Sequence, residues 1–237
     1  MARIDGRQPA DLREISIQPD CYRKHDALVS YGATKVLCYA SIEERVPGWL
    51  AGAGVGWLSG EYNMMPTSSE PRQARERRGA SGRTLEIQRL IGRSLRAALN
   101  LQALPPLTIH IDCDVIVADG GTRTASITGG MVALANLIAT EKRRFRNEPV
   151  KCLVAAVSAG IVKGEPVLDL NYVEDRDAEV DANVVGLSNG GFAEVQATNE
   201  HGTFSREQLD SILDLCQPAL DRLYQMQRDN IELKLPI

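Results

Sequence analysis

The sequence predicts a single mixed α/β domain, and three observations support this fold class. Short runs rich in β-branched and aromatic residues alternate with longer segments whose apolar residues recur at helical spacing. No linker-like stretch divides the 237 residues into separate units. A composition of 43% hydrophobic and 24% charged residues is ordinary for a globular protein and allows a large core. We therefore expect one domain over residues 1–237.

Short strands are expected at the start of the chain. Residues 15–17, 27–31 and 35–42 have the composition of strands, and Gly32 marks a turn between the last two. These features predict an N-terminal region rich in hairpins. The glycine-laden run GAGVGWLSGEY, residues 52–62, predicts another strand with close backbone approaches.

A basic loop and a helix are expected next. The segment PTSSEPRQARERRGASG, residues 66–82, is typical of an exposed, mobile loop whose basic residues are free to reach a partner. From Arg83 onward the apolar residues recur at helical spacing. The apolar stripe of this predicted helix consists of Ile87, Leu90, Ile91, Leu95 and Ala98. Because its arginines lie on other faces, we expect the helix to bury one side and to present basic residues elsewhere.

The middle of the chain predicts a strand, a helix and two more strands. Residues 107–117 have strand composition, whereas residues 124–142 predict a helix rich in Ala, Gly and Leu. The basic run at residues 142–144 suits the C-terminus of that helix. Residues 153–161 and 167–172 predict two strands.

The C-terminal part predicts a hairpin and a helical segment. Residues 184–198 contain two strand-like runs about an Asn-Gly turn, which is a strong hairpin pattern. Pro218 is expected to kink the last helix or to separate two helices. The apolar stripe of that segment consists of Leu209, Ile212, Leu213, Cys216, Leu220, Leu223 and Tyr224. A strand-rich half with a pair of helices is thus followed by a second strand-rich half with one helix. This order is typical of an internal duplication.

The cysteines and the hydropathy pattern indicate a cytoplasmic protein without membrane contact. The five cysteines match neither a zinc site nor a redox pair, so we expect buried free thiols, with Cys38 and Cys113 in apolar strands. The N-terminus is polar, and no apolar stretch approaches the roughly 20 residues that cross a bilayer.

The junction IHIDCDVIVADGGTRTASITGG, residues 109–130, predicts an anion site. A strand ends there in a Gly-Gly-Thr-Arg loop before a helix, so unsatisfied backbone N–H groups and the helix dipole face outward. Arg123 adds a guanidinium that can bind two phosphate oxygens. The alternative is that Gly120 and Gly121 only make a tight turn and that Arg123 is solvated.

The distribution of charge favours a site that combines phosphate with a metal. The net charge of −4 argues against a nucleic-acid partner, yet residues 72–96 carry eight arginines against two glutamates. Acidic residues crowd into residues 169–181. Two ordinary solvated surfaces of opposite bias are the alternative. Asp112, Asp114 and Asp119 are alternative metal ligands, although carboxylates beside a strand more often cap loops.

Seven segments in order make the chain resemble the ribonuclease PH family, which is related to polynucleotide phosphorylase and the exosome core. The segments are TKVLCYASIEE, GEYNMMP, ARE, GRTLEIQRLIGRSLRAAL, IDCDVIVADGGTRTASITGG, VAAVSAGIVKGEPVLDLNYVEDRDAEVDANVV and EVQAT. The resemblance implies two repeated βαβα-type halves of the ribosomal protein S5 domain 2-like type. It also implies a ring-shaped homohexamer built as a trimer of dimers.

The function implied by this resemblance is phosphate-dependent 3′-to-5′ exoribonuclease activity. Such an enzyme, a tRNA nucleotidyltransferase, trims 3′ extensions of precursor tRNA and releases nucleoside diphosphates, with rRNA as a further substrate. The reaction is reversible, so the same site adds nucleotides to RNA 3′ ends. Inorganic phosphate is the co-substrate and Mg²⁺ the expected cofactor.

The resemblance also assigns residues to these roles. The phosphate pocket falls on Arg83, Gly121, Thr122 and Arg123, which is the anion site inferred above from the residues. The catalytic and metal-binding pair falls on Asp175 and Asp181. Carboxylate oxygens suit Mg²⁺, which usually takes one or two protein carboxylates plus phosphate oxygens and water. The arginines expected to contact RNA are Arg72, Arg75, Arg77, Arg78, Arg89 and Arg93.

Two other functions remain open from the sequence. A catalytically silent ring subunit would bind RNA only, and loss of the pocket arginines or the paired aspartates would mark it. A small-molecule phosphotransferase would bind nucleotide without RNA, but the chain has no G-x-x-x-x-G-K-[ST] loop to hold a triphosphate. The three histidines have no recognisable partner pattern, so we expect structural or surface roles for them.

Overall fold

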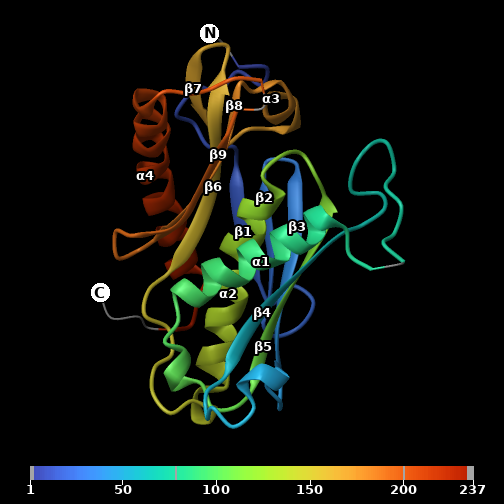
Figure 1. Ribbon diagram of the computed structural model, residues 1–237, viewed down its shortest axis with the longest axis vertical. Coiled ribbons are helices and arrows are strands. Elements are labelled where there is room, and N and C mark those ends of the chain that lie inside the picture. The colour runs from blue at the N-terminus through green and yellow to red at the C-terminus, as the bar shows by residue number, and fades with distance from the viewer. Residues whose placement is uncertain (1–2, 78, 200, 234–237) are drawn as a thin grey trace.

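The computed structural model describes residues 3–77, 79–199 and 201–233, which form two β-sheets and four α-helices (Figure 1). The predicted mixed α/β class is therefore confirmed. The first sheet has the strand order β1-β2-β3-β5-β4, and the second has the order β7-β6-β8-β9. The strands of the first sheet are β1 (Ile15–Pro19), β2 (Asp26–Tyr31), β3 (Thr34–Glu43), β4 (Trp57–Met64) and β5 (Thr108–Val117).

The first sheet contains the predicted N-terminal hairpins and one parallel pair. Strands β1, β2, β3 and β5 pair antiparallel, whereas β4 runs parallel to β5. Parallel neighbours need a crossover, and α1 (Gly82–Ala97) supplies it. Helix α1 buries the predicted stripe, including Ile87 and Ile91, and Ser81 caps its N-terminus by accepting a hydrogen bond from the Thr84 N–H.

The glycine-laden run before β4 is a strand only in its second half. Gly52 and Gly54 have φ angles of 80° and 71°, which a strand does not allow, so β4 begins at Trp57. The predicted close backbone approach occurs at Gly56, where a Cβ would lie 2.5 Å from the Pro105 carbonyl oxygen. The prediction of a strand over residues 52–62 was therefore too long at its start.

The second sheet is entirely antiparallel and contains the predicted C-terminal hairpin. Its strands are β6 (Val154–Val162), β7 (Glu165–Leu168), β8 (Val180–Leu187) and β9 (Phe192–Thr198). The prediction of a strand up to residue 172 was wrong beyond Leu168. Asp169 has a φ angle of 54°, and Asn171 and Glu174 form a capping box that starts α3 (Tyr172–Asp177).

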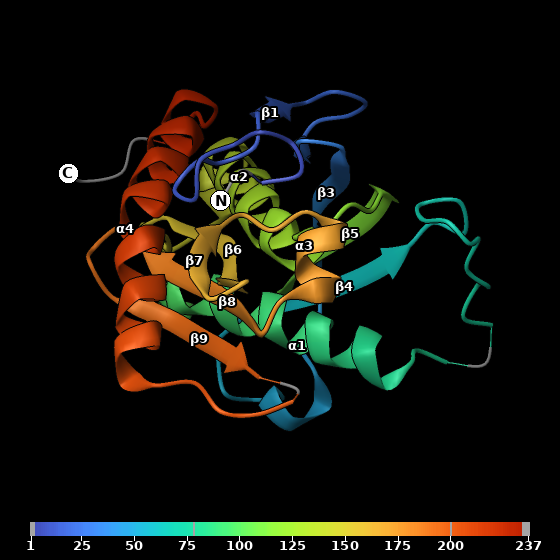
Figure 2. The same ribbon diagram turned by 90° about the horizontal axis from the view of Figure 1, so that it is seen from above.

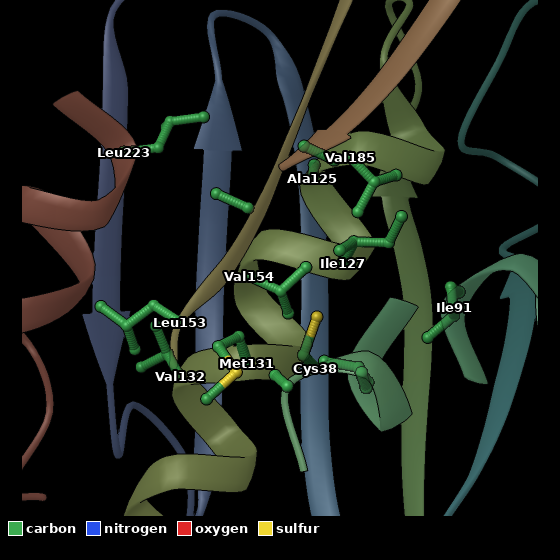
Figure 3. Close-up of a cluster of buried hydrophobic side chains, with 14 of the residues drawn as sticks. Cys38, Ile91, Ala125, Ile127, Met131, Val132, Leu153, Val154, Val185 and Leu223 are labelled. Carbon is green, nitrogen blue, oxygen red and sulfur yellow. The ribbon is translucent and has the colours of Figure 1, made fainter. Parts of the chain in front are cut away.

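Helix α2 (Thr122–Thr140) lies between the two sheets and is buried on nearly all sides. Figure 3 shows its residues Met131 and Val132 among side chains from both halves, including Cys38 of β3 and Leu153 beside β6. Its small residues allow the close approach, since a Cβ at Gly129 would lie 2.6 Å from Val29. A single hydrophobic cluster therefore runs through both sheets.

The ends of two predicted helices differ from expectation. Helix α2 ends at Thr140, and the basic run forms a separate 3₁₀ turn, Lys142–Arg144, in which Arg144 pairs with Glu141 and Glu44. Helix α4 (Arg206–Asp229) continues through Pro218 as one helix, so a break into two helices was wrong. Its stripe stays aligned on both sides of the proline and packs on β6, β7 and β8, which offsets the missing backbone hydrogen bond.

Two segments outside the regular elements position the site. The β4–α1 loop, described over residues 65–77 and 79–81, projects from the body of the molecule in both views (Figures 1 and 2), and its residues 70–77 are all exposed. The segment that precedes β1 is tied to the second half of the chain. The Leu168 N–H donates to the Pro9 carbonyl at 2.8 Å, and Arg3 forms an ion pair with Glu174.

The cysteines are mostly buried, as expected. Cys38, Cys113, Cys152 and Cys216 are buried free thiols, whereas Cys21 is exposed, which corrects the prediction for that residue. None of the described helices combines the length and apolar character needed to cross a membrane.

Candidate active site

The six residues assigned to phosphate and metal line one cleft of about 640 Å³, here called the GGTR cleft. They come from five separate parts of the fold, namely α1, the loop before α2, α2 itself, α3 and β8. The six are Arg83, Gly121, Thr122, Arg123, Asp175 and Asp181. Residues separated by almost 100 positions in the sequence therefore line the same cleft.

The Gly-Gly loop opens the N-terminus of α2 into this cleft. Gly120 and Gly121 have φ angles of 73° and 68°, a left-handed conformation that favours glycine. A Cβ at Gly120 would also clash with the Leu170 carbonyl and lie 2.7 Å from the Asn171 carbonyl carbon. No side chain caps α2, so its first N–H groups remain available to an anion.

Two arginines add positive charge to the same place. Arg123 is half-buried in the first turn of α2, and Arg83 lies exposed at the start of α1. The Arg123 guanidinium donates from Nη1 to Oε1 of Gln196 at 3.4 Å, and Gln196 in turn donates to Glu86 at 3.1 Å. The arrangement of helix N-terminus and two guanidinium groups suits a phosphate with several charged oxygens.

Asp181 and Asp175 form an acidic pair opposite the arginines. Burial, as the largest cause, and the neighbouring negative charge of Asp175 together raise the pKa of Asp181 to about 6, against the opposing effect of Arg123 and Arg83. The Oδ1 atom of Asp181 is buried without a hydrogen-bond partner among the described residues. A carboxyl group whose pKa lies near neutrality can act as a proton donor or acceptor.

The same pair fits a divalent cation. A buried carboxylate oxygen without a partner, beside a second carboxylate, offers the hard oxygen ligands that Mg²⁺ prefers. The described residues contain no group of three or more acidic, His or Cys side chains arranged to hold a metal. A cation at Asp175 and Asp181 would therefore take its remaining ligands from water and phosphate oxygens.

The arginines predicted to contact RNA fall into three groups. Arg75 and Arg77 line the GGTR cleft, while Arg72 lies exposed further along the same loop. Arg89 and Arg93 lie on α1 away from the cleft, and Arg93 is held by Glu194 in an ion pair at 2.8 Å. Arg78 lies outside the described residues.

The β4–α1 loop is anchored beside the cleft by Glu76. Its carboxylate accepts hydrogen bonds from the Ser81 N–H at 3.0 Å and from the Thr84 hydroxyl at 2.9 Å. These hydrogen bonds lower the pKa of Glu76, the Ser81 contact most strongly. Because Glu76 lies between Arg75 and Arg77, its anchoring places both arginines near Arg83.

Of the alternative metal ligands, Asp119 has another role in the structure, whereas Asp114 lines the GGTR cleft. Asp119 accepts a hydrogen bond from the Tyr172 N–H at 3.1 Å and so caps the loop, as expected for an aspartate beside a strand. Asp112 and Asp114 lie side by side on β5, where burial raises the pKa of each carboxyl group. No histidine is among the described residues that line the GGTR cleft.

Two sequence profiles match most of the chain. The profile of the 3′ exoribonuclease family, domain 1, matches residues 11–138, and that of domain 2 matches residues 152–217. The chain belongs to the 3′ exoribonuclease family. The interval between the two matches falls between α2 and β6, so each profile covers one of the two sheets.

Solved structures with a similar fold include a rice protein and two archaeal exosome structures. Rice (Oryza sativa) Rrp46 is 21% identical with a TM-score of 0.77, and the match covers 95% of this chain and 98% of that chain. The Archaeoglobus fulgidus exosome with RNA bound to the active site is 20% identical with a TM-score of 0.78, covering 94% and 91%. An archaeal exosome core is 19% identical with a TM-score of 0.77, covering 95% and 91%. The exoribonuclease-family fold is therefore shared at low identity.

Sequence reasoning missed several residues of this family member's cleft. Tyr62 is buried and its hydroxyl lies 2.9 Å from the Thr122 hydroxyl, while Tyr172 lies exposed at the cleft wall. Asn183 is only 6% exposed and lines the cleft. It is two residues after Asp181 on β8, so the two side chains lie on the same face of the strand. The two-residue spacing from Asp181 could have predicted that the Asn183 side chain lines the cleft. No local sequence pattern indicated that Tyr62 lies there.

Proposed function

We propose that this protein is a phosphate-dependent 3′-to-5′ exoribonuclease that trims 3′ extensions of precursor tRNA. Family membership supports the exoribonuclease class. The observation that carries the phosphorolytic mechanism is the convergence of an uncapped helix N-terminus, two arginines and a partly buried acidic pair in one cleft. The similar exosome structure with RNA at its active site supports RNA as the substrate.

The proposed reaction is an in-line attack of phosphate on the last phosphodiester of the RNA. Arg83, Arg123 and the N–H groups at the start of α2 hold the phosphate. One phosphate oxygen forms a bond to the phosphorus, and the bond from this phosphorus to the preceding 3′ oxygen breaks. The products are a nucleoside diphosphate and an RNA shortened by one residue. Fixed positive charge is needed because two anions must approach each other.

The acidic pair has two roles in this proposal. Asp181, protonated at a pH near or below its raised pKa of about 6, donates a proton to the leaving 3′ oxygen. Asp175 and the unprotonated oxygen of Asp181 would hold Mg²⁺, which when bound would supply charge neutralisation on the transferring phosphoryl group. The reverse reaction, nucleotide addition from nucleoside diphosphates, uses the same groups. We further propose a homohexamer, with rRNA as a second substrate.

The test is an assay of tRNA with extra 3′ nucleotides and Mg²⁺, with and without inorganic phosphate. We expect nucleoside diphosphates to be released only when phosphate is present. Arg123→Ala should abolish this release while leaving RNA affinity nearly unchanged, because it removes a ligand of the attacking phosphate. Arg222→Ala, on the exposed face of α4, is the matched control and should retain full activity.

Each other outcome contradicts a specific part of the proposal. Release of nucleoside monophosphates without phosphate would mean hydrolysis. Binding of RNA without any release would mean a subunit that only binds RNA. Normal turnover by the Arg123→Ala variant would remove Arg123 from the phosphate site.

A further inference from the structure

A buried ion pair lies directly behind the Gly-Gly loop, on the side away from the cleft. Arg13 is 6% exposed and Asp169 is fully buried. The Arg13 guanidinium donates to both Asp169 carboxylate oxygens, at 3.0 and 2.7 Å, and the Arg13 backbone N–H donates to Oδ2 at 2.8 Å. This planar two-point contact fixes the orientation of the guanidinium group.

The same guanidinium binds the backbone of the Gly-Gly loop. Nη1 donates to the Asp119 carbonyl and Nη2 donates to the Gly120 carbonyl at 3.4 Å. Thr34 assists, because its hydroxyl donates to the Gly120 carbonyl at 2.7 Å and accepts from the Asp119 N–H at 2.8 Å. Both carbonyls are therefore held by groups behind the loop.

Holding these carbonyls determines the direction of two N–H groups. In a trans peptide the carbonyl of one residue and the N–H of the next point in opposite directions. Because the carbonyls of Asp119 and Gly120 turn toward Arg13, the N–H groups of Gly120 and Gly121 turn the other way. Neither of these N–H groups donates a hydrogen bond to another part of the chain that the structure describes.

The ion pair also connects the loop with the segment that carries Asp175. The Asp169 N–H donates to the Ser158 carbonyl at 2.6 Å, and two residues later Asn171 caps α3. A second buried ion pair joins the same N-terminal segment to α3, with Nη2 of Arg3 lying 2.6 Å from Oε2 of Glu174. No hydrogen bond given by the structure joins Arg3 to the Gly-Gly loop; Arg3 instead donates to carbonyls that include Leu168 and Asp169.

We infer that Arg13 is a positioning residue for the attacking phosphate: it holds the carbonyls of Asp119 and Gly120 so that the N–H groups of Gly120 and Gly121 face the anion. This inference rests on the proposed function, because it assumes that phosphate binds at the Gly-Gly loop. Arg13 itself touches no substrate. Arg3 provides the comparison, since it also forms a buried ion pair but does not contact the loop.

The test measures the dissociation constant of inorganic phosphate for the full chain, by titration calorimetry without RNA. Arg13→Lys keeps the charge but cannot bind Asp169 and two carbonyls at once. We expect phosphate affinity to fall about tenfold or more, because misaligned donors lose charge-assisted hydrogen bonds. Arg3→Lys, the matched control, should keep phosphate affinity within about twofold while losing comparable thermal stability.

A second pair of variants covers the case in which Arg13→Lys fails to fold. Thr34→Val removes the hydroxyl that holds Gly120, whereas Thr34→Ser retains it. We expect weaker phosphate binding only for valine. In turnover assays both Arg13→Lys and Thr34→Val should raise the KM for phosphate and leave the KM for RNA unchanged.

The outcomes separate this inference from the proposed function. A wild-type protein that binds no phosphate would overturn both. If the wild type binds phosphate but Arg13→Lys binds it equally well, only the positioning role is wrong. Where Arg13→Lys does not fold, equal binding by Thr34→Val has the same meaning. The positioning role is also wrong if Arg3→Lys weakens phosphate binding as much as Arg13→Lys, since the effect would then follow from lost stability.

Discussion

Asp181 shows how one side chain acquires its chemistry from its surroundings. Burial within the second sheet disfavours its charge, Asp175 disfavours it further, and the two arginines compensate only in part. The ordinary pKa of 3.8 rises to about 6 as a result. A carboxyl group in this state is a poor contributor to stability at neutral pH but a useful proton donor or metal ligand.

A pH-dependent stability is expected from this raised pKa. The folded protein binds the Asp181 proton more tightly than the unfolded chain does, so protonation of Asp181 adds to the free energy of unfolding. This stabilising contribution is fully present below pH 3.8 and is lost as pH rises through about 6. Asp181→Asn removes the titration. The variant should therefore gain free energy of unfolding relative to wild type between pH 4 and pH 7, by up to about 3 kcal/mol.

Urea denaturation without Mg²⁺ at several pH values measures this difference. A constant offset between variant and wild type at all pH values would contradict the raised pKa. The same Asp181→Asn variant should lack phosphorolytic activity even with excess Mg²⁺, because it removes both the proposed proton donor and a proposed metal ligand.

At the scale of elements, the site depends on how α2 begins. The helix is almost wholly buried, so only its N-terminus reaches the cleft, and the Gly-Gly loop leads the chain into it. The loop lies against the start of α3, where a Cβ at Gly120 would meet the backbone of Leu170 and Asn171. The Gly-Gly loop and the start of α3 are therefore packed backbone to backbone.

Gly120→Ala tests this packing. The substitution combines a strained positive φ, costing about 1 kcal/mol, with a backbone clash costing about 1–3 kcal/mol, so we expect a loss of about 2–4 kcal/mol in unfolding free energy and loss of phosphate binding. Gly190→Ala is the control, because Gly190 also has a positive φ of 90° but has nothing within 4 Å of its Cβ position. Chemical denaturation should show that Gly190→Ala loses only about 1 kcal/mol of unfolding free energy. Equal losses for the two variants would argue against close packing between the Gly-Gly loop and α3.

At the scale of the whole molecule, α2 joins two sheets through one hydrophobic cluster. Helix α1 packs on the first sheet and helix α4 packs on the second (Figure 1). Both sheets also pack against α2, which lies between them. The cleft lies where the halves meet, and it takes Arg83 from the first and Asp181 from the second. We propose that the chain is a single cooperative unit.

Cooperative unfolding is the expected consequence of this shared core. Trp49 and Trp57 stack edge to face beside the first sheet, whereas Cys216 is buried on α4 against the second. Tryptophan fluorescence and Cys216 labelling, followed by mass spectrometry, should give the same denaturant midpoint. Two separate midpoints would show that the halves unfold as independent domains.

Periodicity and composition predicted most elements, because local preferences decide where strands and helices form. They placed the stripe of α1, the hairpin of β8 and β9, and the strand β5. A break into two helices at Pro218 and a strand over residues 169–172 were wrong, because packing on a sheet and a capping box overrode the local pattern.

The sequence by itself determined the family, because seven segments with characteristic residues follow one another along the chain, and it located the Gly-Gly-Thr-Arg loop. The assignment of Asp175 and Asp181 as the acidic pair is a prediction from the same resemblance. Only the tertiary structure decided that Arg83, Arg123, Asp175 and Asp181 share one cleft, and that Arg13 lies behind the loop. The pKa of Asp181 likewise depends on burial and on neighbours distant in the sequence. Proximity, burial and electrostatic environment arise from packing between elements, which no local pattern encodes.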